Sequence, residues 1–323
     1  MTRESKAWNY HPELPLKDPS VFSLGWHPRA WLGWVMRNWL TLSERILMLG
    51  FAALLWWAFY PGLEQAEQFA LGWVLQVWIV NLGMMIVTAG GLHWWFYQRK
   101  AQGKRLKFDP RDQSKGKLWN FSDQVQDNMF WSLTSGVGQL TAFQVVILWM
   151  MANGYVPVVT FAQNPVWFVL GFVLLPIWSA FHFYWVHRLL HVPFLYRHVH
   201  SLHHRNVNVG PWSGISMHPV EHLLYFSSLL IHCVVPGHPL HLAFHVVYQG
   251  PGAAMTHTGY EDLLIRDKRR LALGTFYHQL HHRYYECNYG NQEMPWDRWF
   301  GTFHDGSDAA TEETRARKKR MFG

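Results

Sequence analysis

Long stretches of the chain carry no charged side chain, and these stretches predict helices that cross a membrane. Residues 46–63, 68–98 and 129–187 contain no Asp, Glu, Lys or Arg. A helix needs about 20 mostly apolar residues to cross the hydrocarbon core. Buried helices of a large soluble protein are the alternative, but these runs are too long and too numerous for it. The third run is split by a turn at 153–157, so we expect four spans, roughly at 45–62, 69–95, 129–152 and 165–186.

The placement of Lys and Arg predicts which side of the membrane each end of these spans occupies. Residues 99–117 contain eight bases, residues 315–320 contain five, and the segment before the first span is also basic. The loop after the first span is acidic, and residues 153–164 carry no charge. Four crossings bring all the basic regions to one side, which should be cytoplasmic. We expect an inner membrane or an endoplasmic reticulum-type membrane, with both termini cytoplasmic.

Another charge-free stretch, residues 222–257, contains many histidines and a turn at 235–239. Lipid does not readily tolerate so many polar rings. A helical hairpin that dips partly into the membrane is the favoured interpretation, and two full crossings are the alternative.

The composition fits a membrane protein that meets water at one end. Only 15% of the 323 residues are charged, 50% are apolar and 20 are Trp. Such a chain is too apolar for disorder, and its two Cys exclude a disulfide scaffold. The net charge of +7 fits an anionic membrane surface, and no nucleic acid is expected as a partner. Five Trp among the first 44 residues predict an interfacial segment; they are Trp8, Trp26, Trp31, Trp34 and Trp39.

Histidine carries the candidate chemistry. Eighteen of the 21 His lie between His182 and His304. Three groups have helical spacing, and they consist of His187 and His191; His200, His203 and His204; and His278, His281 and His282. Residues three and four apart share one helix face. Eight imidazoles exceed the three or four that one zinc site uses, so they predict a site for two metal ions. Imidazole suits Zn, Cu, Fe and Ni, and we favour iron with O2.

Further short motifs surround these groups. Residues 183–191 read F-Y-W-V-H-R-L-L-H and residues 218–221 read H-P-V-E. Residues 257–260 read H-T-G-Y, 288–290 read N-Y-G and 296–302 read W-D-R-W-F-G-T. Together they resemble the fatty acid hydroxylase/sterol desaturase superfamily of integral membrane, histidine-box di-iron oxygenases, over about residues 125–305. Residues 1–120 show no such motif.

The resemblance implies an all-α integral membrane fold, with four transmembrane helices capped by a cytoplasmic helical, His-rich di-metal domain. The chain then divides into an interfacial segment (1–44), a first transmembrane pair with its basic loop (45–124), the catalytic domain (125–305) and a basic tail (306–323). It also implies that the eight box histidines bind two Fe ions, with His257 as an additional ligand. Weaker candidates as ligands or as their hydrogen-bond partners are His218, His222, Glu261 and Asp297. No other catalytic residue stands out.

The implied activity is hydroxylation or desaturation of a lipid C–H bond with O2 as co-substrate. A sterol C5-type desaturase is one alternative to a hydroxylase. The chain has no dinucleotide, ferredoxin or cytochrome motif, so electrons must come from an external donor such as a cytochrome b5-like protein, a ferredoxin or a reductase. From another class, a haem- or metal-binding membrane protein without oxygenase activity remains open, as does a zinc hydrolase.

Overall fold

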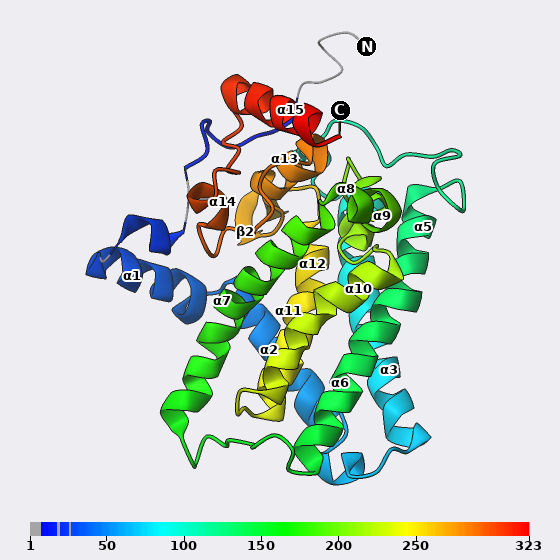
Figure 1. The fold of residues 1–323 in the computed structure, drawn as a ribbon, viewed down its shortest axis with the longest axis vertical. Coiled ribbons are helices and arrows are strands. Elements are labelled where there is room, and N and C mark those ends of the chain that lie inside the picture. The colour runs from blue at the N-terminus through cyan, green and yellow to red at the C-terminus, as the bar shows by residue number, and fades with distance from the viewer. Residues whose placement is uncertain (1–7, 18–19, 26, 323) are drawn as a thin grey trace.

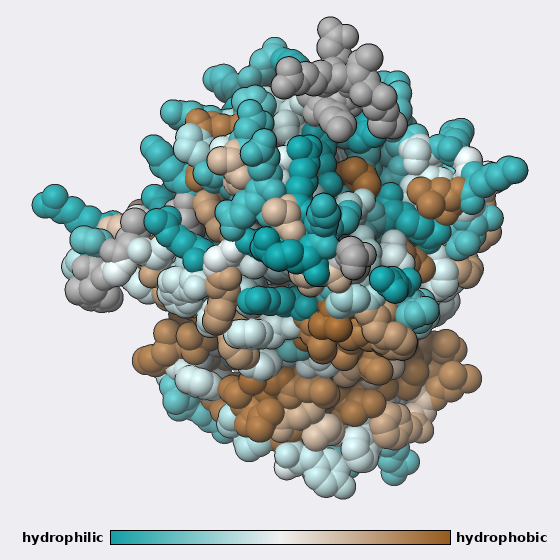
Figure 2. All heavy atoms as spheres, turned by 45° about the horizontal axis from the view of Figure 1, so that its top comes forward, coloured by the Kyte–Doolittle hydropathy of each residue, from teal (hydrophilic) through white to brown (hydrophobic). Residues whose placement is uncertain are grey.

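Four long helical stretches form a stalk in the computed structural model, which describes residues 8–17, 20–25 and 27–322. By length and composition each is apolar enough to cross a membrane, which confirms the expected four spans. They are Pro28–Ala58, Leu71–Gln98, Gln124–Ala152 and Pro165–Leu190. Exposed apolar side chains such as Trp57, Val87 and Val166 cover their outer surface. Figure 2 shows these apolar side chains as a belt below a hydrophilic face.

Several of these stretches contain short π-helical turns between α-helices. The first comprises α1 (Pro28–Val35), a π turn (Met36–Leu40) and α2 (Glu44–Ala58). The second comprises α3 (Leu71–Met85), a π turn (Ile86–Gly90), α4 (Gly91–His93) and a π turn (Trp94–Gln98). The third comprises α5 (Gln124–Trp131), a π turn (Ser132–Gly136) and α6 (Val137–Ala152), and the fourth is α7 (Pro165–Leu190).

The first stretch is not one straight helix. Extended backbone at Thr41 and Ser43 separates α1 from α2, and the Ser43 side chain caps α2 by accepting from the backbone N–H of Ile46. Figure 1 shows α1 turned away from the long axis, while α2 runs down through the stalk. Only α2 therefore matches the expected span at 45–62.

A polar cluster joins the stalk helices from inside. Asn81 of α3 is fully buried, and its side-chain amide donates to Thr141 Oγ1 at 3.0 Å and Gln144 Oε1 at 2.9 Å on α6. The hydroxyl of Tyr60 donates to the Asn81 carbonyl oxygen at 2.6 Å. Such bonds between helices matter because lipid provides no hydrophobic force that would drive helices together.

The histidine-rich hairpin runs the length of the stalk instead of dipping partly into it. It comprises α10 (Pro219–Phe226), a 3-10 helix (Ser227–Cys233) and α11 (Pro239–Gln249). At its turn, the backbone of Gly237 bonds to Pro157 and Val159 in the loop between α6 and α7. Figure 1 shows α11 lying among the stalk helices. The turn therefore lies at the same depth as that loop. The polar rings of the hairpin can lie at this depth because they pack against protein and not against lipid.

Short elements form a cap at the other end. They are α8 (Pro193–Leu195), a π turn (Tyr196–His200), α9 (Ser201–His204), α12 (Pro251–Thr256), α13 (Phe276–Tyr284), α14 (Trp296–Trp299) and α15 (Asp308–Phe322). Three 3-10 turns, Val21–Leu24, Leu63–Ala66 and Pro211–Ser213, complete the described helices. The basic tail thus forms a helix, and Figure 1 shows α15 beside α13 at this end.

The fold is not entirely helical. Strands β1 (Asp262–Ile265) and β2 (Lys268–Ala272) form an antiparallel hairpin in the cap. Its two turn residues, Arg266 and Asp267, both have positive φ, as tight β-hairpin turns require. The all-α expectation was wrong here because the strands are short and mix apolar residues with Lys and Arg, so they lack a clear alternating pattern.

The basic segments lie at the cap end, as their distribution predicts. Lys107 pairs with the backbone of Tyr260, and Arg105 forms an ion pair with Asp267 of the hairpin turn at 2.5 Å. Trp8, in the expected interfacial segment, packs edge-on against Phe276 of α13, with the ring centroids 4.8 Å apart. Trp26 and residues 1–7 of the expected interfacial segment lie outside the described residues.

The depth of the hairpin predicts the side from which its turn can be labelled. In a background lacking both native cysteines, Tyr155→Cys and Val234→Cys should react with a membrane-impermeant maleimide from the same side of sealed vesicles. Both side chains are exposed at the end of the stalk remote from the cap. Lys104→Cys, in the basic loop, is the control and should react from the opposite side. Labelling of Val234→Cys from the Lys104 side would contradict the hairpin's depth.

Candidate metal centre

Nine buried histidines converge at the junction of stalk and cap, in two groups. The first group has five members: His187, His191, His200, His204 and His281. The second has four: His203, His257, His278 and His282. Within each group the ligand atoms lie within 4.8 Å of one another. All eight histidines of the three boxes and His257 are thus brought together.

Helix geometry explains why two boxes are divided between the groups. Residues four apart point in nearly the same direction, whereas adjacent residues diverge by about 100°. His200 and His204 therefore face the first group, and His203 faces the second. In α13, His278 and His282 face the second group while His281 faces the first. Sequence spacing predicts the boxes but not this division into five and four.

Backbone carbonyl groups fix the orientation of several rings through Nδ1. His187 Nδ1 lies 2.6 Å from the Tyr289 carbonyl oxygen, and His281 Nδ1 lies 2.6 Å from that of Cys287. His257 Nδ1 contacts the Ala253 carbonyl oxygen at 2.8 Å. A carbonyl oxygen can only accept, so each of these Nδ1 atoms carries the proton. In the neutral ring, Nε2 then has a free lone pair.

These Nε2 atoms face one another at close range. His187 Nε2 lies 3.1 Å from His200 Nε2, and His281 Nε2 lies 3.0 Å from His204 Nε2. In the second group, His257 Nε2 lies 2.9 Å from His278 Nε2. The first ring of each pair offers a free Nε2 lone pair, and a cation bound between the two rings would accept a second lone pair from the other ring. Two nitrogens at right angles, each about 2.1 Å from one ion, are about 3.0 Å apart. The donor set therefore fits two metal ions.

Burial keeps the ligand rings neutral. It lowers the pKa of His200 and His203 to about 3 and that of His257 to about 4. These rings are therefore unprotonated at neutral pH, the state that metal coordination requires.

Two buried carboxyl groups, which the sequence reasoning missed, contact the outer nitrogens of ligand rings. Glu221 Oε1 lies 2.8 Å from His200 Nδ1, and Glu286 Oε1 lies 3.1 Å from His191 Nδ1. Burial raises the pKa of both carboxyl groups, that of Glu221 to about 8. The raised pKa of Glu221 makes its contact with the neutral His200 ring a hydrogen bond rather than an ion pair. Glu221 is the last residue of the H-P-V-E motif and Glu286 follows the third box by four residues, but neither position indicates which histidine ring the carboxyl group contacts.

The segment after α13 folds back onto the ligands. Tyr285 and Asn288 adopt positive φ values of 71° and 51°, which non-glycine residues rarely do. These bends bring Glu286, Cys287 and Tyr289 to the outer edges of the histidine rings. The reversal depends on backbone conformation, so the motif alone does not predict it.

Asp297 organises this segment without touching a ligand ring. Its carboxylate accepts from the backbone N–H of Tyr289 at 2.9 Å and the hydroxyl of Thr302 at 2.6 Å, and also from the Tyr277 hydroxyl. Tyr289 supplies the carbonyl group that holds His187. The expectation that Asp297 bonds directly to a ligand was wrong, because these backbone and hydroxyl donors occupy its oxygens.

The three other weaker candidates also lie outside the two groups. His218 caps α10 by accepting from the backbone N–H of Val220 at 3.2 Å. His222 bridges Ser135 Oγ and the carbonyl oxygen of Ile215, at 3.0 and 2.9 Å. Glu261 lies in the cap beside β1, where burial raises its pKa to about 7. None of these three belongs to either histidine group among the described residues.

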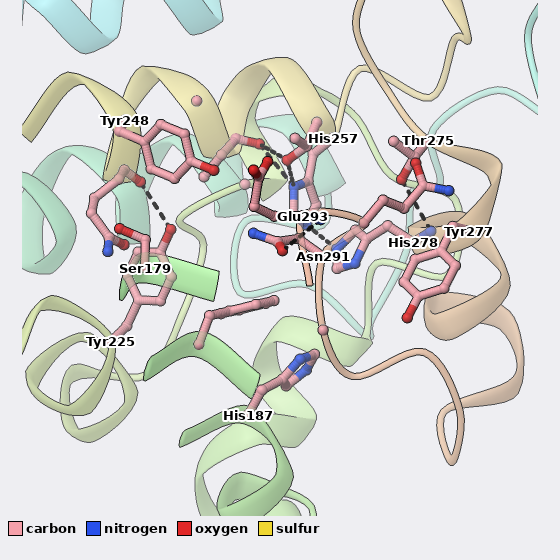
Figure 3. Close-up of a pocket in the computed structure, with 18 of the residues that line it drawn as sticks. Ser179, His187, Tyr225, Tyr248, His257, Thr275, Tyr277, His278, Asn291 and Glu293 are labelled. Atoms are coloured by element: carbon pink, nitrogen blue, oxygen red, sulfur yellow. Dashed lines mark hydrogen bonds between the residues drawn. The ribbon is translucent and has the colours of Figure 1, made fainter. Parts of the chain in front are cut away.

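A cavity of about 390 Å³ opens beside the histidines. Five of the nine line it: His187, His200, His203, His257 and His278. In Figure 3, His187 and His278 lie on different sides of this space, and Tyr225 and Tyr248 lie together at another side. Met48, Phe183 and Leu190 contribute apolar surface. A space lined by imidazoles together with aromatic and apolar side chains suits an apolar substrate.

The similarity to known proteins is concentrated in the part of the chain that contains the histidine boxes. Residues 172–302 match the fatty acid hydroxylase family. A Delta(7)-sterol 5(6)-desaturase of Gibberella zeae is 33% identical over 141 residues, which cover 42% of this chain and 42% of the relative. A Delta(7)-sterol 5(6)-desaturase of Saccharomyces cerevisiae is 30% identical over 131 residues, 39% of this chain and 34% of the relative. The chain thus aligns with less than half the length of these two relatives.

A longer alignment is found with a Delta(7)-sterol-C5(6)-desaturase of Nicotiana tabacum. It is 24% identical over 243 residues, which cover 72% of this chain and 84% of the relative. No solved structure matches the chain. The family match covers α7 from Phe172 to its end and continues through all three histidine boxes to Thr302. The matched part of the chain therefore resembles the fatty acid hydroxylase family and the Delta(7)-sterol 5(6)-desaturases.

Proposed function

We propose that the chain is a membrane di-iron oxidoreductase that hydroxylates or desaturates a C–H bond of a lipid with O2 and externally supplied electrons. The observation that carries this proposal is the pair of histidine groups whose facing Nε2 lone pairs line an apolar cavity. Iron is favoured over zinc because the relatives are named desaturases. Desaturation is an oxidation, and zinc has no redox chemistry. Of the two reactions, the names of the relatives favour desaturation, with a sterol as the lipid.

The chain's own residues would hold the metal ions and the lipid substrate in position. The five- and four-histidine groups would each hold one iron, and the bound pair would supply the O2 chemistry. The carbonyl oxygens of Tyr289 and Cys287 hold their rings in the tautomer that leaves Nε2 free, and the carboxyl groups of Glu221 and Glu286 orient the rings of His200 and His191. The cavity's apolar walls exclude water and hold the lipid against the ligands.

An external redox protein would deliver the electrons at the cap. The basic loop 99–117 and α15 both lie at this end, and they offer complementary charge to an acidic partner surface. A cytochrome b5-like protein, a ferredoxin or a reductase would meet this requirement. We also propose that this end is cytoplasmic, because basic loops favour that side.

Removing one ligand from each group tests the metal assignment. His203→Ala and His281→Ala should each lose at least one of the two irons, and formation of the ¹⁸O-labelled or desaturated lipid should fall to background. Metal analysis of the purified protein and comparative lipidomics under ¹⁸O2 measure the two effects. His218→Asn keeps the helix cap outside both groups and should retain iron and product. Retention of both in the two Ala variants would refute the di-iron proposal.

Glu286 tests the support of the ligand rings. Glu286→Ala removes the hydrogen-bond partner of His191 and should weaken iron binding by about 10- to 100-fold, the usual effect of losing a ligand's outer partner. Glu286→Gln keeps an acceptor oxygen and should lose much less, since the hydrogen bond to His191 Nδ1 can still form. Chelator titration of the iron-loaded protein measures both variants, with the exposed Glu312→Ala as control. Equal affinity in the Ala and Gln variants would show that Glu286 does not support the site through this bond.

A further inference from the structure

One wall of the cavity holds a buried ion pair that the metal chemistry does not use. Arg45, near the start of α2, pairs with Glu293, in the segment between α13 and α14. Their side chains are only 7% and 5% exposed. The Arg45 guanidinium also lies over the rings of Trp34 and Trp39, at 5.3 and 5.7 Å. Both partners line the same cavity as the histidines.

This ion pair leaves polar atoms unused. Nε and Nη1 of Arg45 and Oε1 of Glu293 are buried and have no hydrogen-bond partner within the described ranges. Burying a polar atom without a hydrogen-bond partner is unfavourable, and more so when the atom belongs to a charged group. The wall thus offers two donors and one acceptor close together, which a bound ligand can satisfy.

The charges on this wall favour a neutral ligand. Arg37 and Arg45 line the cavity here together with Glu44 and Glu293, so two cations face two anions. A carboxylate or phosphate would meet the two glutamates, and an ammonium group would meet the two arginines. A hydroxyl group avoids both repulsions because it can accept from Arg45 and donate to Glu293 Oε1.

We propose that the Arg45–Glu293 pair binds the hydroxyl group of a neutral, alcohol-bearing lipid whose hydrocarbon part extends along the cavity to the histidines. This inference rests on the proposed function, because it assigns the substrate class of that site. Met48, Phe183 and Val186 supply apolar surface along the way. The volume of about 390 Å³ falls within the usual range for small-molecule sites. Glu293 lies within the family match, but Arg45 lies outside it.

Binding of matched ligand pairs to the purified full-length protein in nanodiscs tests this proposal. The probes are hexadecan-1-ol and its methyl ether, and a sterol with one free hydroxyl group and its methyl ether. In at least one pair the alcohol should bind about tenfold more tightly, because the ether cannot donate and leaves Glu293 Oε1 unpaired. Hexadecanoic acid at neutral pH should bind more weakly than hexadecan-1-ol.

Glu293→Gln provides the matched variant. Its amide can still accept from Arg45, but its NH2 group would face the ligand as a donor. The preference for the alcohol over the ether should therefore fall toward unity. Leu47→Ala changes an exposed residue of α2 that does not line the cavity and should preserve the preference. A variant that merely loosens the fold would weaken the binding of the alcohol and of its ether to the same extent.

The outcomes separate this inference from the proposed function. Equal binding of alcohol and ether in both pairs by the unmodified chain, absence of binding, or preference for the acid overturns the hydroxyl site. An alcohol preference that survives in Glu293→Gln also overturns the assignment to this pair. These measurements need no turnover. If the alcohol is preferred but the iron-loaded protein forms no oxidised lipid, the proposed oxidoreductase fails while the binding site stands.

Discussion

The arrangement of the metal centre follows from one constraint, the tautomer of its histidine rings. A carbonyl oxygen that accepts from Nδ1 commits the ring to a lone pair on Nε2, and here several such lone pairs face one another at about 3 Å. On the proposed function, each group would offer these lone pairs to one metal ion. Folding of the cap and binding of metal would then be coupled, as in other sites whose ligands converge only in the native state.

The parts of the chain that impose this constraint are not the boxes themselves. Tyr289 and Cys287 belong to the segment that reverses after α13, and positive φ at Tyr285 makes that reversal possible. Asp297 then holds the segment in place by binding the backbone of Tyr289. The motif that contains Asp297 thus acts on His187 through a peptide group. This explains why a charged residue in such a motif need not contact a ligand.

The sequence predicts those features that depend on local pattern. The length of the charge-free runs predicts the stalk helices, and the helical spacing of the histidines predicts the boxes. Both signals are local, because they depend only on residues that are close together in the sequence. The division of nine histidines into five and four, the contacts of Glu221 and Glu286, and the depth of the hairpin depend on how distant segments meet. The β-hairpin was missed for a different reason, since two short strands rich in Lys and Arg carry too weak a period to distinguish them from a loop.

The cavity shows how a shared centre can serve different substrates. Its histidine wall comes from the family-matched residues 172–302, whereas Trp34, Arg37, Arg45 and Met48 come from the N-terminal region outside that match. Residues of this N-terminal wall can therefore be replaced without disturbing the histidines, since the cavity separates the two. On the proposed function, α1, α2 and the π turn between them would form the part of the cavity that distinguishes one lipid from another. The same metal ligands, combined with a different N-terminal segment, would present the same chemistry to a differently shaped lipid.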